Sequence, residues 1–454
     1  MNKKITFTEA LLTAIGMVIG SGIFFRADNI LTYTEGNVGI AVLAWVGLGT
    51  TLIFAGIGVS VLASRSQREG GIIGYMEDCF GDKAAFLTGW FTTFVYIPLL
   101  TGILGIVAAG FFCDLVGIER GAGSVQAIAF IMIVACYCWN YLSTKFSALF
   151  SSAATVIKLL PIVIVGLIGM TKLDIGMVSE GMSAFDMALF SAPLLSMAFA
   201  FDGWTSVATL SRDMENPQKD IAKVLALNAI IVTAAYTLYF TGMTMVLTEQ
   251  WGAENLFANI TEAGDGHVAI AAEAVLGGIG EKFVIFCVVM SVMGTLNGNV
   301  MAGFRYPHAL AQAKDLPNSE FFVQESKYGT TGRAAMITFC AVAAWYVLYT
   351  VQAFARQNAA EGAEFMFYGI DFDDIPIVTM SLIIVILLIG TMKYGLKEGY
   401  GVFKAGIAPV IGILGQLYVM YSFVITNPKW LPYIIVVIII VAIGYVIRTQ
   451  LKKA

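Results

Sequence analysis

The sequence predicts an all-α protein that crosses a membrane many times. Of its 454 residues, 58% are hydrophobic and only 13% are charged, whereas soluble domains carry about 25% charged residues. Apolar runs of about 20 residues, the length that spans a bilayer as a helix, recur throughout the chain. These runs lack the period-2 alternation of membrane β-barrel strands. No basic cluster with interleaved aromatic residues indicates nucleic-acid binding.

About twelve apolar runs predict as many transmembrane helices, joined mostly by short polar segments. The runs cover residues 8–33, 38–63, 84–113, 124–142, 147–171, 187–210, 222–247, 282–306, 333–354, 374–392, 404–425 and 431–448. With a cytoplasmic N-terminus, about nineteen lysines and arginines fall on the inner side and about five on the outer side. This asymmetry predicts a multi-pass protein of the cell membrane with both termini in the cytoplasm.

The first run contains a glycine-rich interruption, AIGMVIGSGIFFR, at Ala14 to Arg26. Glycine weakens a helix by roughly 1 kcal/mol relative to alanine, and a helix broken at membrane depth survives only where it lines a protein-walled cavity. The freed N–H groups, together with the positive end of the next half-helix, suit an anion such as a carboxylate. The alternative explanation is close packing of small residues between helices.

The sixth run contains a second interruption, at Asp202 and Gly203 within Leu195 to Val207. Two broken helices in corresponding places of the two halves predict a transport site. Residues 1–454 are then one transporter domain, in which 8–171 and 187–392 form two inverted repeats of five helices each. Helices eleven and twelve follow at 404–448.

Lys158 lies in the middle of the apolar run Ala148 to Gly169, about ten residues from either end. A lysine at this depth costs at least about 3 kcal/mol on insertion scales, so an intramembrane lysine indicates function. Snorkelling to an interface is the alternative, and a role in proton coupling stays open.

Five motifs, taken in order, resemble those of amino-acid permeases of the amino acid–polyamine–organocation superfamily. The most similar branch is that of the L-type amino-acid transporters, which includes bacterial serine/threonine and alanine/serine/cysteine exchangers. The motifs are GSGIF at 20–24, GGIIGYMEDCFG at 70–81, IKLLPI at 157–162, FAFDGW at 199–204 with DMENPQKD after it, and SVMGTLNG at 291–298.

The resemblance implies a substrate site at the two interruptions. The substrate carboxylate would bind the N–H groups of Ser21 and Gly22, helped by the Ser21 hydroxyl. The α-amine would meet carbonyl groups at the two breaks, Phe199 would be the gating aromatic, and Lys158 would stand in for a sodium ion. The carbonyl groups that meet the amine would be those of Val18, Phe199 and Asp202, and Ala200 and Thr205 would line the pocket for the substrate side chain. The full set of substrate-binding residues that the resemblance implies is Val18, Ile19, Gly20, Ser21, Gly22, Ile23, Phe199, Ala200, Phe201, Asp202 and Thr205.

These features predict a secondary active transporter, a sodium-independent exchanger of small neutral L-amino acids that works by alternating access. A proton-coupled symporter is the main alternative, and a sensor that binds an amino acid without moving it is a third. The sequence contains no nucleotide-binding loop and no catalytic cluster, so no enzyme activity, cofactor or metal is expected. The predicted partners are the amino-acid substrate and membrane lipid. Animal relatives bind a heavy subunit through a cysteine in the loop after helix three, but the loop Asp114 to Ser124 has none.

The sequence leaves the roles of Arg26 and Asp202 open. Arg26 lies about one turn beyond the first break; it is either a rim residue or, if it faces the pocket, a residue that favours a substrate with an acidic side chain. Asp202 either orients the unwound backbone, pairs with a cation or is solvated. The single histidines, His267 and His308, are expected on the surface.

Overall fold

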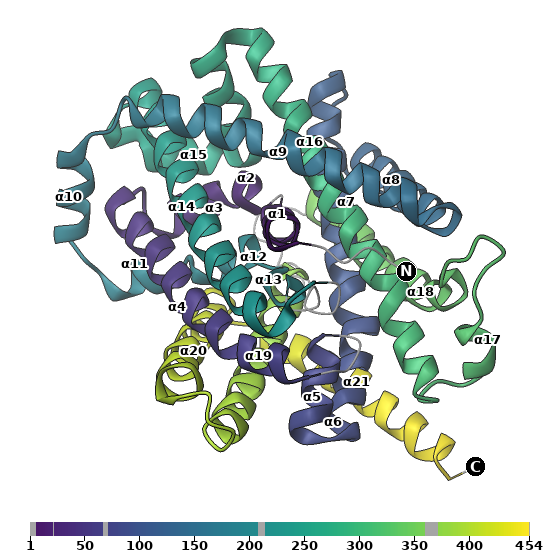
Figure 1. Cartoon of the computed structure of the whole chain (residues 1–454). Coiled ribbons are helices and arrows are strands. Elements are labelled where there is room, and N and C mark those ends of the chain that lie inside the picture. Colours follow the sequence, from purple (N-terminus) through teal and green to yellow (C-terminus); the bar gives the residue numbers. More distant parts are fainter. Residues whose placement is uncertain (1–5, 21, 67–70, 208–213, 359–370, 454) are drawn as a thin grey trace. The chain divides into compact units, whose positions relative to one another are not determined.

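The computed structural model describes residues 6–20, 22–66, 71–207, 214–358 and 371–453 (Figure 1). Helices make up 85% of the structure, and no strand is formed within the described residues. The described part contains eleven helices that are long and apolar enough to cross a membrane, or twelve if the bent pair Ile175–Ser183 and Met187–Ala200 counts as one span. The predicted all-α polytopic fold is therefore confirmed.

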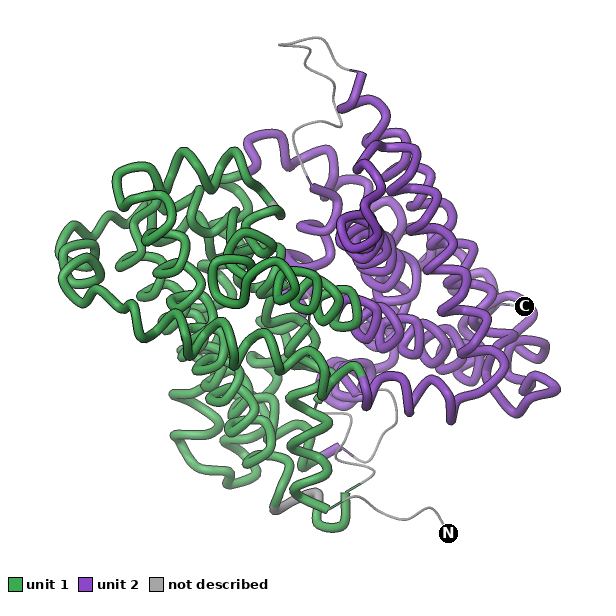
Figure 2. Tube along the Cα trace, turned by 90° about the horizontal axis from the view of Figure 1, so that it is seen from above, with its two compact units in different colours: residues 1–65, 154–291, 384–426 green, residues 66–153, 292–383, 427–454 purple. Residues whose placement is uncertain are grey.

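The chain forms two compact units, coloured separately in Figure 2. Unit 1 comprises residues 1–65, 154–291 and 384–426, and unit 2 comprises residues 66–153, 292–383 and 427–454. Each unit takes residues from both predicted repeats, so the compact units are not the repeats themselves. The repeat boundaries remain a prediction.

Unit 1 contains both predicted interruptions. Its complete helices are α1 (Phe7–Val18), α2 (Gly22–Phe25), α3 (Ala27–Tyr33), α4 (Val38–Arg65), α10 (Ile175–Ser183), α11 (Met187–Ser191), α12 (Leu194–Ala200), α13 (Trp204–Val207), α14 (Pro217–Trp251), η3 (Ala253–Asn255), α15 (Leu256–Ala263), η4 (Gly264–Gly266), η5 (Phe403–Ile407) and α20 (Ala408–Thr426).

Unit 2 contains α5 (Ile72–Phe80), α6 (Asp82–Phe91), the π-helical turn η1 (Thr92–Tyr96), α7 (Ile97–Val116), α8 (Ala122–Leu142), α17 (Ser319–Val323), α18 (Gly332–Gln357) and α21 (Leu431–Leu451). Three long helices contribute residues to both units: α9 (Thr144–Met170), α16 (His267–Gln312) and α19 (Asp374–Gly395).

Local sequence signals explain where several helices begin and end. The side chains of Thr6 and Glu9 form a reciprocal capping box at the start of α1, which satisfies two backbone donors. Gly277 interrupts α16 with φ +71° and ψ −179°, a backbone conformation that favours glycine. Two helical segments of α16 therefore meet at a kink at Gly277.

The expectation that His267 lies on the surface is wrong, because its side chain is completely buried. The ring Nδ1 lies 2.6 Å from the carbonyl oxygen of Gly264, at the beginning of α16. A histidine in a short polar turn can be buried when neighbouring segments pack over the turn. The residue type alone does not indicate this burial.

In unit 1, small residues allow the long helices to approach closely. A Cβ atom built on Gly49 of α4 would overlap Thr233 of α14, and one built on Gly169 of α9 would overlap the backbone of Gly242. Contacts of this kind replace the hydrophobic driving force that helices lack in lipid.

In unit 2, a buried polar network joins α8, α9 and α16. The Asn297 Oδ1 accepts hydrogen bonds from Trp139 Nε1 (2.6 Å), Asn140 Nδ2 (2.8 Å) and Ser147 Oγ (3.0 Å). Its Nδ2 donates to the Ser147 carbonyl (3.1 Å) and to Ser151 Oγ (2.7 Å). Because every polar atom of Asn297 is satisfied, the network can hold three helix segments of this unit together without a desolvation penalty.

Candidate functional site: two broken helices in unit 1

The two interruptions predicted from the sequence are real breaks in the helices. The first span stops at Val18 and starts again at Gly22, and Ile19 between them has an extended backbone with φ −64° and ψ 106°. The sixth span stops at Ala200 and starts again at Trp204, with Gly203 at φ +92°. Ser21 lies outside the described residues, so its predicted role is left as an expectation.

The two breaks lie directly against each other. A Cβ atom built on Gly22 would lie 2.5 Å from the Cα of Ala200, and one built on Gly203 would lie 2.7 Å from the Met17 carbonyl oxygen. Each break thus contributes one glycine that packs on the backbone of the other helix. The sequence offers close helix packing and a helix break as alternative explanations of the glycines. At Gly22 the structure shows both.

Three carbonyl groups at the first break receive hydrogen bonds from three different helices. Lys158 Nζ of α9 donates to the Gly16 carbonyl (2.6 Å), and Tyr236 Oη of α14 donates to the Val18 carbonyl (3.0 Å). Ser291 Oγ of α16 donates to the Gly20 carbonyl (3.2 Å). In hydrocarbon each unsatisfied carbonyl would cost several kcal/mol, so these side chains stabilise the unwound backbone.

Lys158 is buried, with a relative exposure of 2%. One turn earlier on α9, Thr155 packs against Gly16, since a Cβ there would lie 2.8 Å from Thr155 Oγ1. The same face of α9 therefore contacts α1 twice. Among the described residues no carboxylate lies within ion-pair distance of Lys158, and within this part of the chain the ammonium donates to the Gly16 carbonyl.

Phe199 and Arg26 form an aromatic and cationic stack beside the breaks. The Phe25 and Phe199 rings meet edge to face with centroids 5.4 Å apart. The Arg26 guanidinium lies 5.2 Å from the Phe25 centroid and 4.9 Å from the Phe199 centroid, and Arg26 is only 5% exposed. Arg26 is therefore not an exposed residue, and its guanidinium is buried against the predicted gating aromatic.

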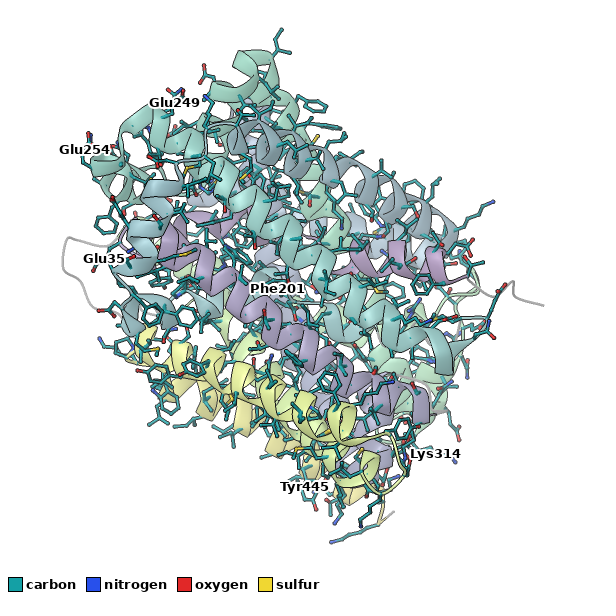
Figure 3. All side chains as sticks on the ribbon, turned by 60° about the vertical axis from the view of Figure 1, so that its left-hand side comes forward. Glu35, Phe201, Glu249, Glu254, Lys314 and Tyr445 are labelled. Atoms are coloured by element: carbon teal, nitrogen blue, oxygen red, sulfur yellow. The ribbon has the colours of Figure 1, made fainter. Side chains whose placement is uncertain are left out.

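A second cluster of aromatic side chains packs at the second break. Phe201, labelled in Figure 3, packs against Trp45 (5.5 Å between centroids) and Tyr236 (5.2 Å). All three side chains are buried. They hold α4, α12 and α14 together next to the breaks.

A family profile described as amino acid permease matches residues 5–448. The chain belongs to the amino acid permease family. This confirms the resemblance that the five motifs indicate. The family and the relatives below are transporters, so this permease is a multi-pass membrane transporter and not an enzyme.

Individual relatives agree with this assignment. The permease is 26% identical to the serine/threonine exchanger SteT of Bacillus subtilis, over 94% of this chain and 92% of that protein. It is 26% identical to the human cystine/glutamate transporter, over 70% of this chain and 62% of the transporter. The crystal structure of MhsT in complex with L-phenylalanine matches 97% of this chain and 98% of that chain with a TM-score of 0.60; at 14% identity this likeness concerns the fold.

The structure brings the described members of the predicted site together in unit 1. Val18, Ile19, Gly20, Gly22, Ile23, Phe199, Ala200, Phe201 and Thr205 are all buried, and Asp202 is half-buried. Asp202 lies in the turn of the second break, where its N–H donates to the Phe199 carbonyl (3.1 Å). The described residues contain no group of three or more histidine, cysteine, aspartate or glutamate side chains that could hold a metal ion.

Sequence reasoning missed two residues at the breaks of this permease. Ser291 begins the motif SVMGTLNG, so a polar residue in an apolar run was a usable signal. Tyr236 lies in an apolar helix where tyrosine is common, and nothing in the sequence connects it with residues more than 200 positions earlier.

Proposed function

We propose that this permease is a sodium-independent exchanger of small neutral L-amino acids that works by alternating access. The observation that carries the proposal is the hydrogen bond from the buried Lys158 ammonium to the Gly16 carbonyl (2.6 Å) at the first break. Backbone carbonyls are ligands that a sodium ion uses, and here a fixed cation occupies one of them. The relative SteT, named as a serine/threonine exchanger, supports the same assignment.

In this proposal the substrate carboxylate binds at the start of α2, on the N–H groups of Ser21 and Gly22. The first N–H groups of a helix have no partner within the helix, and they carry the positive end of its dipole. The α-amine meets carbonyl groups of Val18, Phe199 and Asp202, and Phe199 covers the substrate. Ala200 and Thr205 leave room for a small side chain.

The proposal also includes the topology that the charge distribution favours. Both termini face the cytoplasm, 8–171 and 187–392 are inverted repeats, and no covalent heavy subunit takes part. A carrier that crosses the membrane slowly when empty couples the movement of one amino acid to that of another.

Uptake of labelled serine into proteoliposomes tests this function. We expect uptake only when the lumen contains unlabelled serine or threonine, at equal rates in sodium and in choline buffer. Uptake into empty liposomes that follows an inward proton gradient would replace exchange by symport. Binding without uptake would indicate a sensor.

One observation favours a second substrate class. The buried Arg26 guanidinium stacks on Phe199 and could pair with a carboxylate on a substrate side chain. The relative that is named a cystine/glutamate transporter has the same degree of identity as SteT. Counter-transport with glutamate in place of serine separates the two classes: the main proposal expects serine to be exchanged and glutamate to be rejected.

A further inference from the structure

The third span, Asp82–Val116, changes its helix type in unit 2. It consists of α6, the π-helical turn η1 and α7, and Pro98 is the second residue of α7. At the end of the π-turn the Ile97 N–H donates to the Thr92 carbonyl, five residues earlier and not four as in an α-helix. Proline has no N–H group, and its ring would clash with the carbonyl four residues earlier. Pro98 therefore explains why the hydrogen bonding changes at this place.

The carbonyl that loses its partner to Pro98 receives a donor from another helix. In an α-helix the N–H of residue 98 would bond the Phe94 carbonyl. Here the Trp345 Nε1 of α18 donates to the Phe94 carbonyl oxygen at 2.9 Å, and Trp345 is only 9% exposed. An unsatisfied carbonyl is costly at membrane depth. The indole N–H thus takes the place of the N–H that Pro98 lacks.

A second side chain supports the same turn from α16. The Asn299 Nδ2 donates to the Ile97 carbonyl (3.0 Å) and to Thr101 Oγ1 (2.8 Å). Both Asn299 and Trp345 belong to unit 2, as the third span does. The hydrogen bonding around Pro98 therefore depends on side chains that lie outside the third span.

The π-turn contains a hydroxyl group that is not satisfied. Thr93 has no exposed surface, and its Oγ1 has no hydrogen-bond partner in the described part of the chain. The hydroxyls of Thr88, Thr92 and Thr101 in the same span each donate to a carbonyl one turn earlier, at 2.9, 2.9 and 2.7 Å. A buried polar group without a partner is uncommon and needs an explanation. A turn that has a second conformation, in which Thr93 is satisfied, provides one.

We propose that the π-turn of the third span is a hinge and that Trp345 is the positioning residue that holds it. The proposal rests on the proposed function, because a carrier that works by alternating access moves between two conformations. Hinges are a few residues that absorb changes of the backbone angles, and π-helical turns occur frequently at functional sites. Since the Phe94 carbonyl is held by an indole and not by its own helix, the third span can bend here without breaking a backbone hydrogen bond.

Two substitutions separate the role of the indole N–H from that of the ring. Trp345→Phe keeps an aromatic ring and removes the N–H. Pro98→Ala returns a backbone N–H that can bond the Phe94 carbonyl. Serine exchange in proteoliposomes, expressed per inserted transporter, and thermal unfolding are measured for the wild type, the two single variants and the double variant.

We expect Trp345→Phe to lower the maximal exchange rate about ten-fold, because loss of the donor changes the relative energies of the conformations that the hinge connects. The KM for serine should stay within about two-fold, since the proposed substrate site lies at the breaks of the first and sixth helices. In the Pro98→Ala background the same substitution should lower the rate less than about three-fold and lower the Tm less. Equal losses in both backgrounds overturn the proposal, because the ring and not its N–H would then matter. A lowered Tm with an unchanged maximal rate also overturns it, because the role is then structural only.

Trp90→Phe is the matched control for the loss of an indole N–H. Trp90 of α6 is 5% exposed, and its Nε1 donates to the Ile440 carbonyl of α21 at 3.0 Å. Residue 444, four positions later, is a glycine and not a proline, so its backbone N–H can bond the same carbonyl. We expect Trp90→Phe to keep the maximal rate within about two-fold. A loss as large as that in Trp345→Phe would contradict a special role of Pro98.

The double variant covers the case in which Trp345→Phe does not accumulate in the membrane. Accumulation of Pro98→Ala/Trp345→Phe then supports the proposal, and failure of the double variant to accumulate overturns it. The wild-type protein tests the function separately. If it exchanges no amino acid, the proposed function fails, while the Tm values of the four proteins still show whether Trp345 replaces the N–H that Pro98 lacks.

Discussion

Gly22 and Ala200 are in backbone contact, so the first and sixth helices meet without a side chain between them. A Cβ atom at Gly22 would lie 2.5 Å from the Cα and 3.1 Å from the backbone nitrogen of Ala200. Backbone atoms cannot move aside as a flexible side chain can. The two unwound segments must therefore separate if any larger residue replaces Gly22.

We predict that Gly22→Ala abolishes amino-acid exchange and lowers the free energy of unfolding by about 1–3 kcal/mol, the usual cost of overpacking. Gly56→Ala is the control, because a Cβ at this glycine of α4 would make only ordinary contacts of 3.8 Å with Leu225. Uptake assays and thermal unfolding of both variants check this. Wild-type exchange in Gly22→Ala would contradict the described contact.

Lys158→Met keeps most of the side chain but removes the ammonium that donates to the Gly16 carbonyl. We predict that exchange falls to background while the protein still inserts into the membrane, because a lysine at this depth opposes insertion by about 3 kcal/mol. Lys172→Met is the control: Lys172 forms a partly exposed ion pair with Glu249, and such pairs contribute about 0–1 kcal/mol. Full exchange activity in Lys158→Met would remove the cation role.

Arg26→Gln removes the guanidinium that stacks on Phe25 and Phe199. A desolvated cation–π contact contributes about 2 kcal/mol, so we predict that the KM for the exchanged amino acid rises up to about 30-fold. Arg120→Gln removes an exposed guanidinium that lies 5.3 Å from the Phe111 centroid, and should change the KM little. Equal effects of the two substitutions would show that burial of Arg26 at the breaks has no special role.

Asn297→Leu should destabilise the protein by about 3 kcal/mol or more, since each polar group left unsatisfied costs about 1–3 kcal/mol. Asn228→Leu is the matched test on a second buried asparagine. Asn228 is 2% exposed, and its side-chain oxygen has no hydrogen-bond partner among the described residues. We therefore expect Asn228→Leu to leave the Tm unchanged or to raise it, in a thermal unfolding experiment on both variants. A larger loss of Tm in Asn228→Leu than in Asn297→Leu would contradict the stabilising role of the Asn297 hydrogen bonds.

The helical breaks could be predicted from the sequence because their cause is local. Gly20 and Gly22 weaken the first helix, and Asp202 and Gly203 weaken the sixth, whatever lies around them. Lys158 could likewise be singled out, because a charge in a long apolar run is conspicuous. Its partner, the Gly16 carbonyl, could not be named from the residues, because backbone groups carry no sequence signal.

The site features that could not be predicted from the sequence depend on contacts between helices that are far apart in the chain. Tyr236 has an ordinary residue type for an apolar helix, and only the fold brings it to Val18 and Ala200. Asn297 lies within a motif that resembles the family pattern, yet its four polar partners come from α8 and α9. Arg26 was left open because its burial depends on Phe199, which lies on another helix.

The ammonium of Lys158 is covalently part of α9, and this has a thermodynamic consequence for transport. A dissolved ion can enter with the substrate on one side and leave on the other, and its gradient then performs work on the substrate. A tethered cation returns with the protein after every crossing, so as long as the ammonium keeps its proton no ion gradient performs such work at this position. In the proposed exchange, two pools that trade amino acids through the carrier would approach the same ratio of one amino acid to another, while the total in each pool stays constant.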